Sequence, residues 1–200
     1  MRKKTVAAFD FDGTITTIDT FPEFIRFACG NKTFYAGFIL HSFMLIRMKL
    51  KLYPNWKAKQ RLFSYFFKNM PLTDFDKICQ DFCIKKEKYI IRPQAKSAIQ
   101  EHVNQGNDVL IISASIDNWI KPFAQQLGIS YVLGTQIEVN PQSYITGRFS
   151  NNNCYGSEKV RRIKEIYPDK NEYKLVAYGD SRGDKELLDY ADESYYKCFK

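Results

Sequence analysis

The sequence predicts an α/β fold with a mostly parallel sheet, into which an all-helical segment is inserted. Three short aliphatic runs, Lys4–Phe9, Asp108–Ser113 and Lys174–Tyr178, each lead within two residues to a serine or an aspartate. Near-continuous apolar runs of this length are typical of strands buried on both faces of a parallel sheet. Helical patterns alternate with these runs, which favours βαβ units with right-handed crossovers. With 200 residues, 44% of them hydrophobic, the chain is long enough to bury such a core.

The remaining elements of the sheet and its covering helices follow from weaker patterns. Further strands are expected at Tyr131–Leu133 and Ser194–Cys198. The covering helices, two of which stop at a glycine suited to a C-cap, are expected at Pro93–Gln105, Asn118–Leu127, Ser157–Ile166 and Asp184–Ala191. The turn residues of Asn140–Cys154 predict a hairpin with Tyr144–Ile145 and Arg148–Phe149 as its arms.

The connection between the first two strands predicts the insertion. It spans about 100 residues, whereas a βαβ crossover needs only a dozen or more. We therefore expect residues 1–16 and 92–200 to form the α/β core, and residues 17–91 to form a helical subdomain. Its helices are expected at Phe21–Cys29, Thr33–Met48, Asn55–Asn69 and Thr73–Tyr89. The uncharged run Thr33–Ile46 is shorter than the roughly 20 residues of a membrane span, so it predicts a buried bundle helix.

The positive charge of the chain is concentrated in one stretch of this insertion. Phe24–Thr73 contains no acidic residue, and it holds nine bases, namely Arg26, Lys32, Arg47, Lys49, Lys51, Lys57, Lys59, Arg61 and Lys68. The whole chain carries a net charge of +8, so the rest is close to neutral. This stretch is either a solvated helix face or a surface for an anionic partner. Peripheral contact with anionic lipid stays open, whereas nucleic acid is not expected because no recognition motif is present.

Cysteine usage and the first residues of the chain indicate a reducing compartment. The five cysteines form no tight, even framework, and the closely spaced Cys79 and Cys83 are read as buried thiols rather than zinc ligands. The apolar run after Met1 is too short for a signal peptide, because Asp10 and Asp12 interrupt it. We expect a cytoplasmic protein that is a monomer or a homodimer.

Four acidic residues are expected to meet at one edge of the sheet. Asp10 and Asp12 lie two residues apart after the first strand, so on an extended backbone both side chains point the same way. Asp180 and Asp184 follow a second buried strand. Open α/β sheets bind ligands beyond the carboxyl ends of their strands. Clustered carboxylates repel one another unless a cation neutralises them, and oxygen ligands with a phosphate-bearing substrate favour Mg²⁺.

Two further positions are suited to holding a phosphate. The hydroxyl of Ser113 and the backbone amide of Ala114 follow the second strand. Lys159 lies in the first turn of a helix, where an ammonium group and free backbone amides attract anions. Taken singly, such a serine is usually a cap and such a lysine is usually solvated.

The order of these motifs resembles the haloacid dehalogenase-like phosphohydrolase superfamily. The motifs are Asp10-Phe11-Asp12-Gly13-Thr14, Ser113, Lys159 and Gly179-Asp180-Ser181-Arg182-Gly183-Asp184. The helical insertion after the first motif resembles the phosphoserine-phosphatase-like branch of subfamily IB, with a C1-type cap. The resemblance implies a three-layer Rossmann-like core and a Mg²⁺-dependent phosphomonoesterase that acts on a small organic phosphate ester.

The resemblance also implies the role of each residue. Asp10 is the nucleophile that forms an aspartyl-phosphate, and Asp12 is the general acid and then the general base. Mg²⁺ is held by the Asp10 carboxylate, the Asp12 main-chain carbonyl and Asp180, with Asp184 supporting this set of ligands. Ser113, Ala114 and Lys159 hold the transferring phosphoryl group.

Departures from the phosphoserine phosphatase pattern concern the substrate. Asp19 stands where those enzymes carry a glutamate that reads the substrate amine, and Ala114-Ser115 replace the usual Gly-Gly. The nine bases, interleaved with aromatic and aliphatic residues, favour a substrate with anionic or amphiphilic character. Two alternatives remain, which are a phosphotransferase with the same chemistry and an inactive module that binds a polyanion or a membrane.

Overall fold

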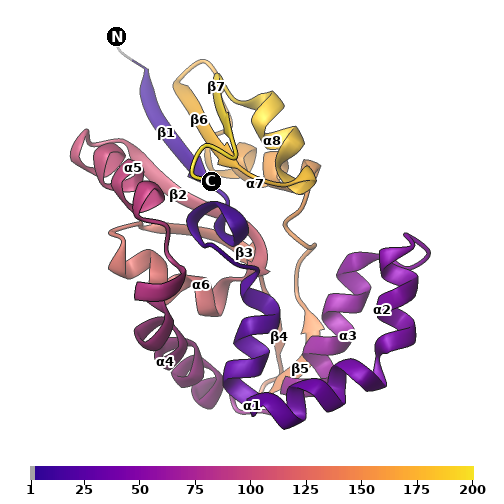
Figure 1. The fold of residues 1–200 in the computed structure, drawn as a ribbon. Coiled ribbons are helices and arrows are strands. Elements are labelled where there is room, and N and C mark those ends of the chain that lie inside the picture. Colours follow the sequence, from indigo (N-terminus) through magenta and orange to yellow (C-terminus); the bar gives the residue numbers. More distant parts are fainter. Residues whose placement is uncertain (1–2) are drawn as a thin grey trace.

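The computed structural model describes residues 3–200 and has an α/β core with a helical cap below it (Figure 1). A five-stranded sheet in the order β3-β2-β1-β6-β7 forms the core, and all of its strand pairs are parallel. Its strands are β1 (Lys4–Phe9), β2 (Asp108–Ile116), β3 (Tyr131–Thr135), β6 (Tyr173–Gly179) and β7 (Glu193–Tyr196). The expected α/β fold with a mostly parallel sheet is confirmed.

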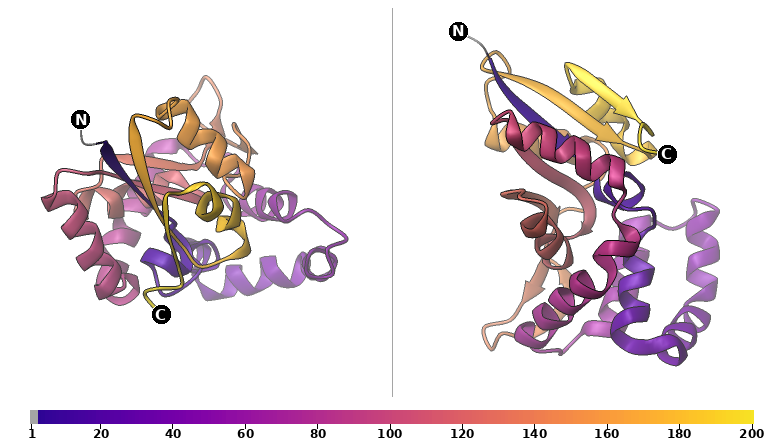
Figure 2. Two further views of the ribbon diagram at one scale, coloured as in Figure 1. Left: turned by 90° about the horizontal axis from the view of Figure 1, so that it is seen from above. Right: turned by 60° about the vertical axis from the view of Figure 1, so that its left-hand side comes forward.

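Helices cover both faces of the sheet, which makes the core three layers thick (Figure 2). Alternate residues of β1 point to opposite faces, Ala7 and Phe9 to one side and Val6 and Ala8 to the other. The first face packs against α5 (Pro93–Asn104) and α6 (Asp117–Gln126), and the second against α7 (Ser157–Ile166) and α8 (Lys185–Tyr190). The apolar runs in the sequence are continuous because both faces of the central strands are buried.

Four α-helices lie between β1 and α5, and we refer to residues 17–91, the expected helical subdomain, as the cap. They are α1 (Thr20–Leu40), α2 (Ser42–Lys49), α3 (Asn55–Phe67) and α4 (Leu72–Ile90). Phe24 of α1 is completely buried, packs on Phe67, Phe75 and Phe82, and stacks on Trp119 of α6 at 4.7 Å between ring centroids. This aromatic cluster attaches one side of the cap to the core.

The two chain passages between core and cap run side by side. The amide of Thr17 donates to the carbonyl of Ile90 at 2.7 Å, and the amide of Arg92 donates to the carbonyl of Ile15 at 2.9 Å. Thr16 and Ile91 form an isolated antiparallel bridge between these bonds. A short two-stranded connection therefore joins the cap to the core.

The expected helix Thr33–Met48 was wrong in its boundaries and in its burial. Gly30 breaks α1 with φ 77° and ψ 164°, and the chain ends that helix at Leu40 before α2 begins at Ser42. No residue of α2 is buried, and Phe43 is 72% exposed. The uncharged run Thr33–Ile46 therefore presents apolar side chains both to the interior of the cap and to solvent.

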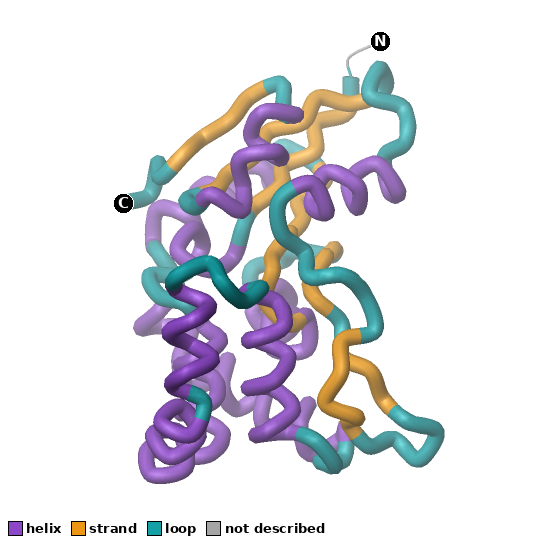
Figure 3. The backbone as a smooth tube through the Cα atoms, turned by 90° about the vertical axis from the view of Figure 1, so that its right-hand side faces the viewer, coloured by secondary structure: helices purple, strands orange, loops and turns teal. Residues whose placement is uncertain are grey.

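The hairpin was placed wrongly in the sequence. Residues 145–149 form a single strand, β5 (Ile145–Phe149), which pairs antiparallel with β4 (Ile137–Val139). The turn lies at Asn140–Tyr144 instead, where the side chain of Asn140 accepts from the amides of Gln142 and Tyr144. The hairpin lies beside the cap helices rather than in the main sheet (Figure 3), and the amide of Ile145 donates to the carbonyl of Met70 at 2.9 Å.

All five cysteines are free thiols, and Cys79, Cys83 and Cys154 are buried. Within residues 3–200, none of the helices combines the length and the apolar character needed to cross a bilayer.

Candidate active site

The acidic motifs meet where the direction of the chain across the sheet changes. From β1 the chain continues to β2 and β3 on one side, whereas β6 and β7 lie on the other side. Asp10 directly follows β1, and Asp180 directly follows β6. Ligands of open α/β sheets bind in the crevice at such a switch point. The parallel pairing of β1 with β6 therefore brings together two motifs that are 170 residues apart in the chain.

Lys159 lies between two of these acids in the interior. Its Nζ donates to Asp10 Oδ1 at 2.7 Å, to Asp184 Oδ1 at 2.5 Å and to the carbonyl of Ile112 at 2.8 Å. Only 2% of Lys159 is exposed. Burial alone lowers the pKa of this ammonium group, but Asp10 and Asp184 outweigh it and raise the pKa above its usual range. Lys159 is therefore a permanent positive charge at the base of the site.

Asp10 and Asp184 respond differently to the same lysine. Burial, only partly opposed by Lys159, raises the pKa of Asp10 to about 7. For Asp184, Lys159 and the hydrogen bonds from Ser181 outweigh burial and hold the pKa below its usual range. The second oxygen of Asp184 accepts from the amides of Asp180 and Ser181 and from the Ser181 hydroxyl, at 3.2, 2.9 and 2.8 Å. Asp184 thus fixes the loop that carries Asp180.

Gly13 is required by the close approach of the two acidic loops. Its φ is +78°, and a Cβ built at this position lies 2.5 Å from Asp180 Oδ2. Any side chain here would displace Asp180 and strain the backbone. The adjacent Thr14 hydroxyl donates to Asp180 Oδ1 at 3.4 Å.

Three carboxylates of the pocket provide oxygen atoms of the kind that bind a hard cation. One oxygen each from Asp10, Asp180 and Asp184 lies within 4.8 Å of the others. Oxygen donors of this kind suit Mg²⁺. Two ammonium groups also contact these acids, because Lys200 donates to Asp180 Oδ2 at 2.8 Å in addition to Lys159. The residues present therefore fit a divalent cation, which would compete with Lys200 for Asp180.

The carboxylate of Asp12 turns away from this set and toward the cap. Its Oδ1 accepts from the amide and the hydroxyl of Thr20, at 2.8 and 2.5 Å, and its Oδ2 accepts from the Ser115 hydroxyl at 2.5 Å. Sequence reasoning missed both Thr20 and Ser115 as partners of Asp12. Ser115 could have been found, because it lies two residues after Ser113 on an extended strand and so shares its side.

Ser113 and Ala114, which are expected to bind phosphate together with Lys159, lie next to a lysine from the cap. Ser113 is buried, and its hydroxyl accepts from the amide of Ser115 at 3.1 Å. The carbonyl of Ala114 accepts from Lys59 Nζ of α3 at 2.8 Å. Burial lowers the pKa of Lys59, although Asp12 and Asp19 oppose this effect. Sequence reasoning counted Lys59 only among the nine bases, because nothing in the local pattern separates it from its exposed neighbours.

A pocket of about 550 Å³ joins these residues and extends into the cap. The pocket is lined by all of the predicted site residues, namely Asp10, Asp12, Asp19, Ser113, Ala114, Lys159, Asp180 and Asp184. Asp19 also has a structural task, because its Oδ1 accepts from the amide of Phe21 at 3.0 Å as the N-cap of α1. The opposite wall is apolar and comes from the cap, namely from Phe38, Leu45, Met48, Ala58 and Leu62.

Comparisons with known proteins agree with this architecture. A family model described as haloacid dehalogenase-like hydrolase matches residues 7–189. Protein CicA of Caulobacter vibrioides is 30% identical over 202 residues, which cover 98% of this chain and 86% of that protein. A histidinol-phosphatase of Neisseria meningitidis is 27% identical over 108 residues, covering 52% of this chain and 49% of that protein.

Solved structures extend the likeness to the whole fold. A protein of unknown function from Bordetella pertussis superposes with a TM-score of 0.86 at 16% identity, covering 96% of this chain and 89% of its own. A substrate-bound phosphoserine phosphatase superposes with a TM-score of 0.66 at 19% identity, covering 98% and 87%. At these identities the likeness is one of fold. Fold and family model together define a Rossmann-like α/β hydrolase. The chain belongs to the haloacid dehalogenase-like hydrolase family, and its fold is phosphoserine-phosphatase-like.

Proposed function

We propose that this protein is a Mg²⁺-dependent phosphomonoesterase that acts through an aspartyl-phosphate on Asp10. The observation that carries the proposal is the position of the Asp10 carboxylate, which lies at the base of a pocket between Lys159 and two further acids. The similarity to a histidinol-phosphatase, 27% identical over 108 residues, supports phosphate ester hydrolysis. The expected substrate is a small organic phosphate ester, and the expected location is the cytoplasm.

The first step breaks the ester bond. A carboxylate oxygen of Asp10 attacks phosphorus, the bond from phosphorus to the ester oxygen breaks, and Asp12 donates a proton to the leaving alkoxide. In the second step Asp12 takes a proton from water, whose oxygen attacks phosphorus and releases inorganic phosphate and free Asp10. Thr20 and Ser115 keep Asp12 beside the reacting ester, since they hold both of its carboxylate oxygens.

The phosphoryl oxygens are assigned to groups of the core. The Ser113 hydroxyl, the Ala114 amide and the Lys159 ammonium group all border the pocket beside Asp10. These groups offset the negative charge that develops on the transferring phosphoryl group. Lys159 is held in place by Asp10, Asp184 and the carbonyl of Ile112, so its ammonium group exchanges one of these three acceptors for a phosphoryl oxygen when substrate binds.

The Asp10 carboxylate, the Asp12 main-chain carbonyl and Asp180 are assigned to Mg²⁺, with Asp184 as their support. When bound, Mg²⁺ neutralises the phosphate and draws electron density from phosphorus. Asp184 suits the supporting role because four donors already engage its oxygens. The ion would compete with Lys200 for the Asp180 carboxylate.

Hydrolysis of an aryl phosphate tests this proposal. Wild type with Mg²⁺ is expected to release the aryl alcohol and phosphate in equal amounts, and chelation of Mg²⁺ is expected to abolish turnover. Asp10→Asn is expected to lower kcat by about 1,000-fold or more, because the nucleophile is lost. The exposed Asp189→Asn is the matched control and is expected to retain wild-type turnover. Full activity of folded Asp10→Asn, or activity independent of Mg²⁺, would overturn the mechanism.

Two alternatives are separable in the same assay. A phosphotransferase would release less inorganic phosphate than aryl alcohol when an acceptor alcohol is added, because the acceptor would carry the missing phosphate. An inactive module that binds a polyanion would give no turnover with any phosphate ester, and it would bind polyanions in a salt-dependent way.

A further inference from the structure

The outer end of the cap exposes an apolar surface that continues across two helices. The spacing of Ile39, Phe43, Ile46 and Leu50 by three or four residues repeats one helix face from the end of α1 through α2. We call this the tip surface and define it as Ile39, Leu40, Phe43, Ile46, Leu50 and Leu52, all of them between 56% and 72% exposed. Soluble monomers rarely expose a contiguous apolar surface of this kind unless it binds something.

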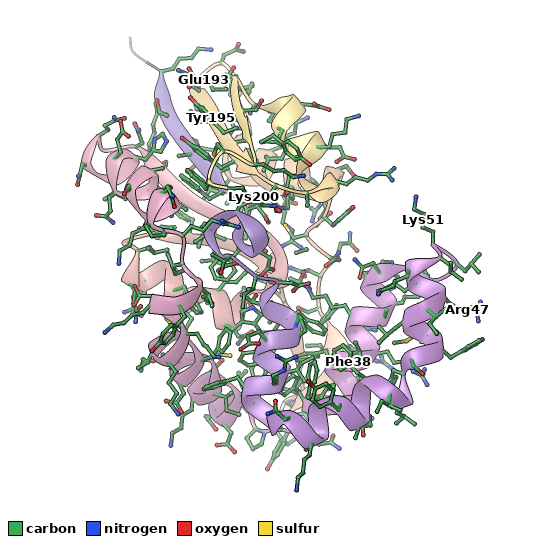
Figure 4. All side chains as sticks on the ribbon, in the orientation of Figure 1. Phe38, Arg47, Lys51, Glu193, Tyr195 and Lys200 are labelled. Atoms are coloured by element: carbon green, nitrogen blue, oxygen red, sulfur yellow. The ribbon has the colours of Figure 1, made fainter. Side chains whose placement is uncertain are left out.

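Positive charge surrounds the tip surface. Arg47, Lys49, Lys51, Lys57 and Arg61 are exposed on α2, on α3 and on the loop between them. Within residues 3–200, none of these five forms an ion pair with a carboxylate. Figure 4 shows Arg47 and Lys51 pointing outward, whereas Phe38 points in between the cap helices. The charges are therefore available to an external anion.

Apolar and basic groups meet in a shallow groove at this end of the cap. The groove has a volume of about 310 Å³, and its walls include Leu40, Phe43, Arg47, Tyr53 and Arg61. The guanidinium carbon of Arg47 lies 5.9 Å from the centre of the Phe43 ring. An amphipathic element with bases beside aromatic and aliphatic side chains is typical of one that lies in the headgroup region of an anionic membrane.

The same helix reaches the candidate active site from its other side. Leu45 and Met48 of α2 line the pocket that holds Asp10, together with Phe38 of α1. Met48 and Leu45 thus alternate along α2 with the exposed Phe43, Ile46 and Arg47. An apolar wall therefore connects the reacting carboxylates with the tip surface through the thickness of one helix.

The charges around the tip surface favour an anionic lipid surface over a second copy of this chain as its binding partner. A second copy of this chain would bring the same bases and no acids from Phe24–Thr73, so the two tip surfaces would repel each other. An anionic lipid surface supplies both the negative charge and the apolar environment.

We propose that the tip surface docks on an anionic lipid membrane, and that the phosphate monoester cleaved at Asp10 carries an apolar chain. The second half rests on the proposed function. Docking places α2 in the headgroup region, with the pocket behind it. The apolar wall of Phe38, Leu45 and Met48 then receives the chain of the ester while its phosphate reaches Lys159.

Vesicle sedimentation of the full chain tests the docking. We compare phosphatidylcholine vesicles with vesicles that contain about 30% phosphatidylglycerol, and we expect binding to the latter, weakened by salt. Phe43→Ser combined with Ile46→Ser is expected to weaken binding about tenfold or more, as is Arg47→Gln combined with Lys51→Gln. The matched controls are expected to bind as wild type does. These are Ile84→Ser with Tyr89→Ser, and Lys88→Gln with Lys185→Gln, all at exposed positions outside the tip surface.

Hydrolysis separates this inference from the proposed function. All four double variants are expected to hydrolyse the aryl phosphate as wild type does, because none of the substituted residues lines the pocket. With dodecyl phosphate in anionic vesicles, kcat/KM is expected to exceed that for ethyl phosphate at least tenfold, and the tip variants are expected to lose this preference.

Three results would overturn the inference while leaving the proposed function intact. They are equal binding of wild type and tip variants, a preference for ethyl phosphate, and a stable dimer in solution that the tip variants dissociate.

Discussion

The charge of Asp10 depends strongly on its surroundings. Burial raises its pKa to about 7, whereas the ordinary value is 3.8. The folded protein therefore binds one more proton than the unfolded chain between these two values. A group of this kind contributes stability at low pH and loses it as the pH rises through the folded pKa.

This shift predicts how stability changes with pH. In Mg²⁺-free buffer, the free energy of unfolding of wild type is expected to fall relative to that of Asp10→Asn as pH rises from about 4 to 7. The reason is that asparagine cannot ionise. Urea unfolding of both proteins at several pH values measures the difference, and added Mg²⁺ is expected to reduce it by pairing with the ionised carboxylate. A difference that stays constant over this range would show that Asp10 has an ordinary pKa.

The sequence identifies some residues of the site better than others. Asp10, Asp12, Ser113, Lys159, Asp180 and Asp184 could be selected because each ends or follows an apolar run, or opens a helix, in a recognisable motif. Thr20 and Lys59 could not be selected in this way, because their parts depend on tertiary contacts such as that between Lys59 and Ala114, which lie 55 residues apart. Ser115 could have been selected from its position two residues after Ser113, although its contact with Asp12 joins residues 103 apart.

Gly30 determines the course of the cap helices at the scale of elements. Its φ of 77° and ψ of 164° lie in a region that only glycine adopts readily, and the chain of α1 changes direction there. The second half of α1 consequently carries Phe38 toward the pocket and Ile39 toward solvent.

Gly30→Ala is expected to destabilise the protein by about 2 kcal/mol through backbone strain alone. A built Cβ at Gly30 has no atom within 4 Å, so no steric clash adds to this cost. Gly106→Ala is the matched control. It is equally open, but its φ of +72° lies at a helix end in the left-handed region, where alanine costs about 1 kcal/mol. Urea unfolding measures both, and an equal or smaller loss for Gly30→Ala would contradict the strain argument.

Helices and strands that are buried on all sides were predicted from the sequence more accurately than those that are partly exposed. The central strands β1, β2 and β6 were predicted well, because burial on both faces imposes a continuous apolar run. The break at Gly30 lies in the predicted gap between the helices Phe21–Cys29 and Thr33–Met48, whereas the separation of α2 from α1 at His41 and the position of β5 were not predicted. The position of β5 depends on tertiary contacts, such as the hydrogen bond from the amide of Ile145 to the carbonyl of Met70 in the loop after α3.

For the whole molecule, the attachment of the cap limits how the site can open. The aromatic cluster of Phe24, Phe82 and Trp119 holds α1 and α4 against α6. The paired passages at Thr17 and Ile90 lie near the pocket. Opening is therefore expected on the side of α2 and α3, where α3 contacts Ala114 of the core through Lys59 and the β4–β5 hairpin through Gln60.

Hydrogen exchange of the full chain tests this motion. With Mg²⁺ and orthovanadate, a phosphate mimic, the amides of α2 and α3 are expected to exchange about tenfold more slowly than without them. Closing the cap excludes water from the pocket. Amides of α4 serve as the internal control and are expected to change little. Equal protection of α2, α3 and α4 in both conditions would argue against a moving cap.

The side-by-side passages also have a consequence for how such a protein can diversify. Because the strand that leaves the core at Thr16 is bridged to the strand that returns at Ile91, everything between them forms a closed loop anchored at one place. A different segment of any length could be grafted onto the same two residues without lengthening or shifting the sheet. A new cap with a new specificity would then require matching changes in the β4–β5 hairpin, because that hairpin forms hydrogen bonds with the present cap.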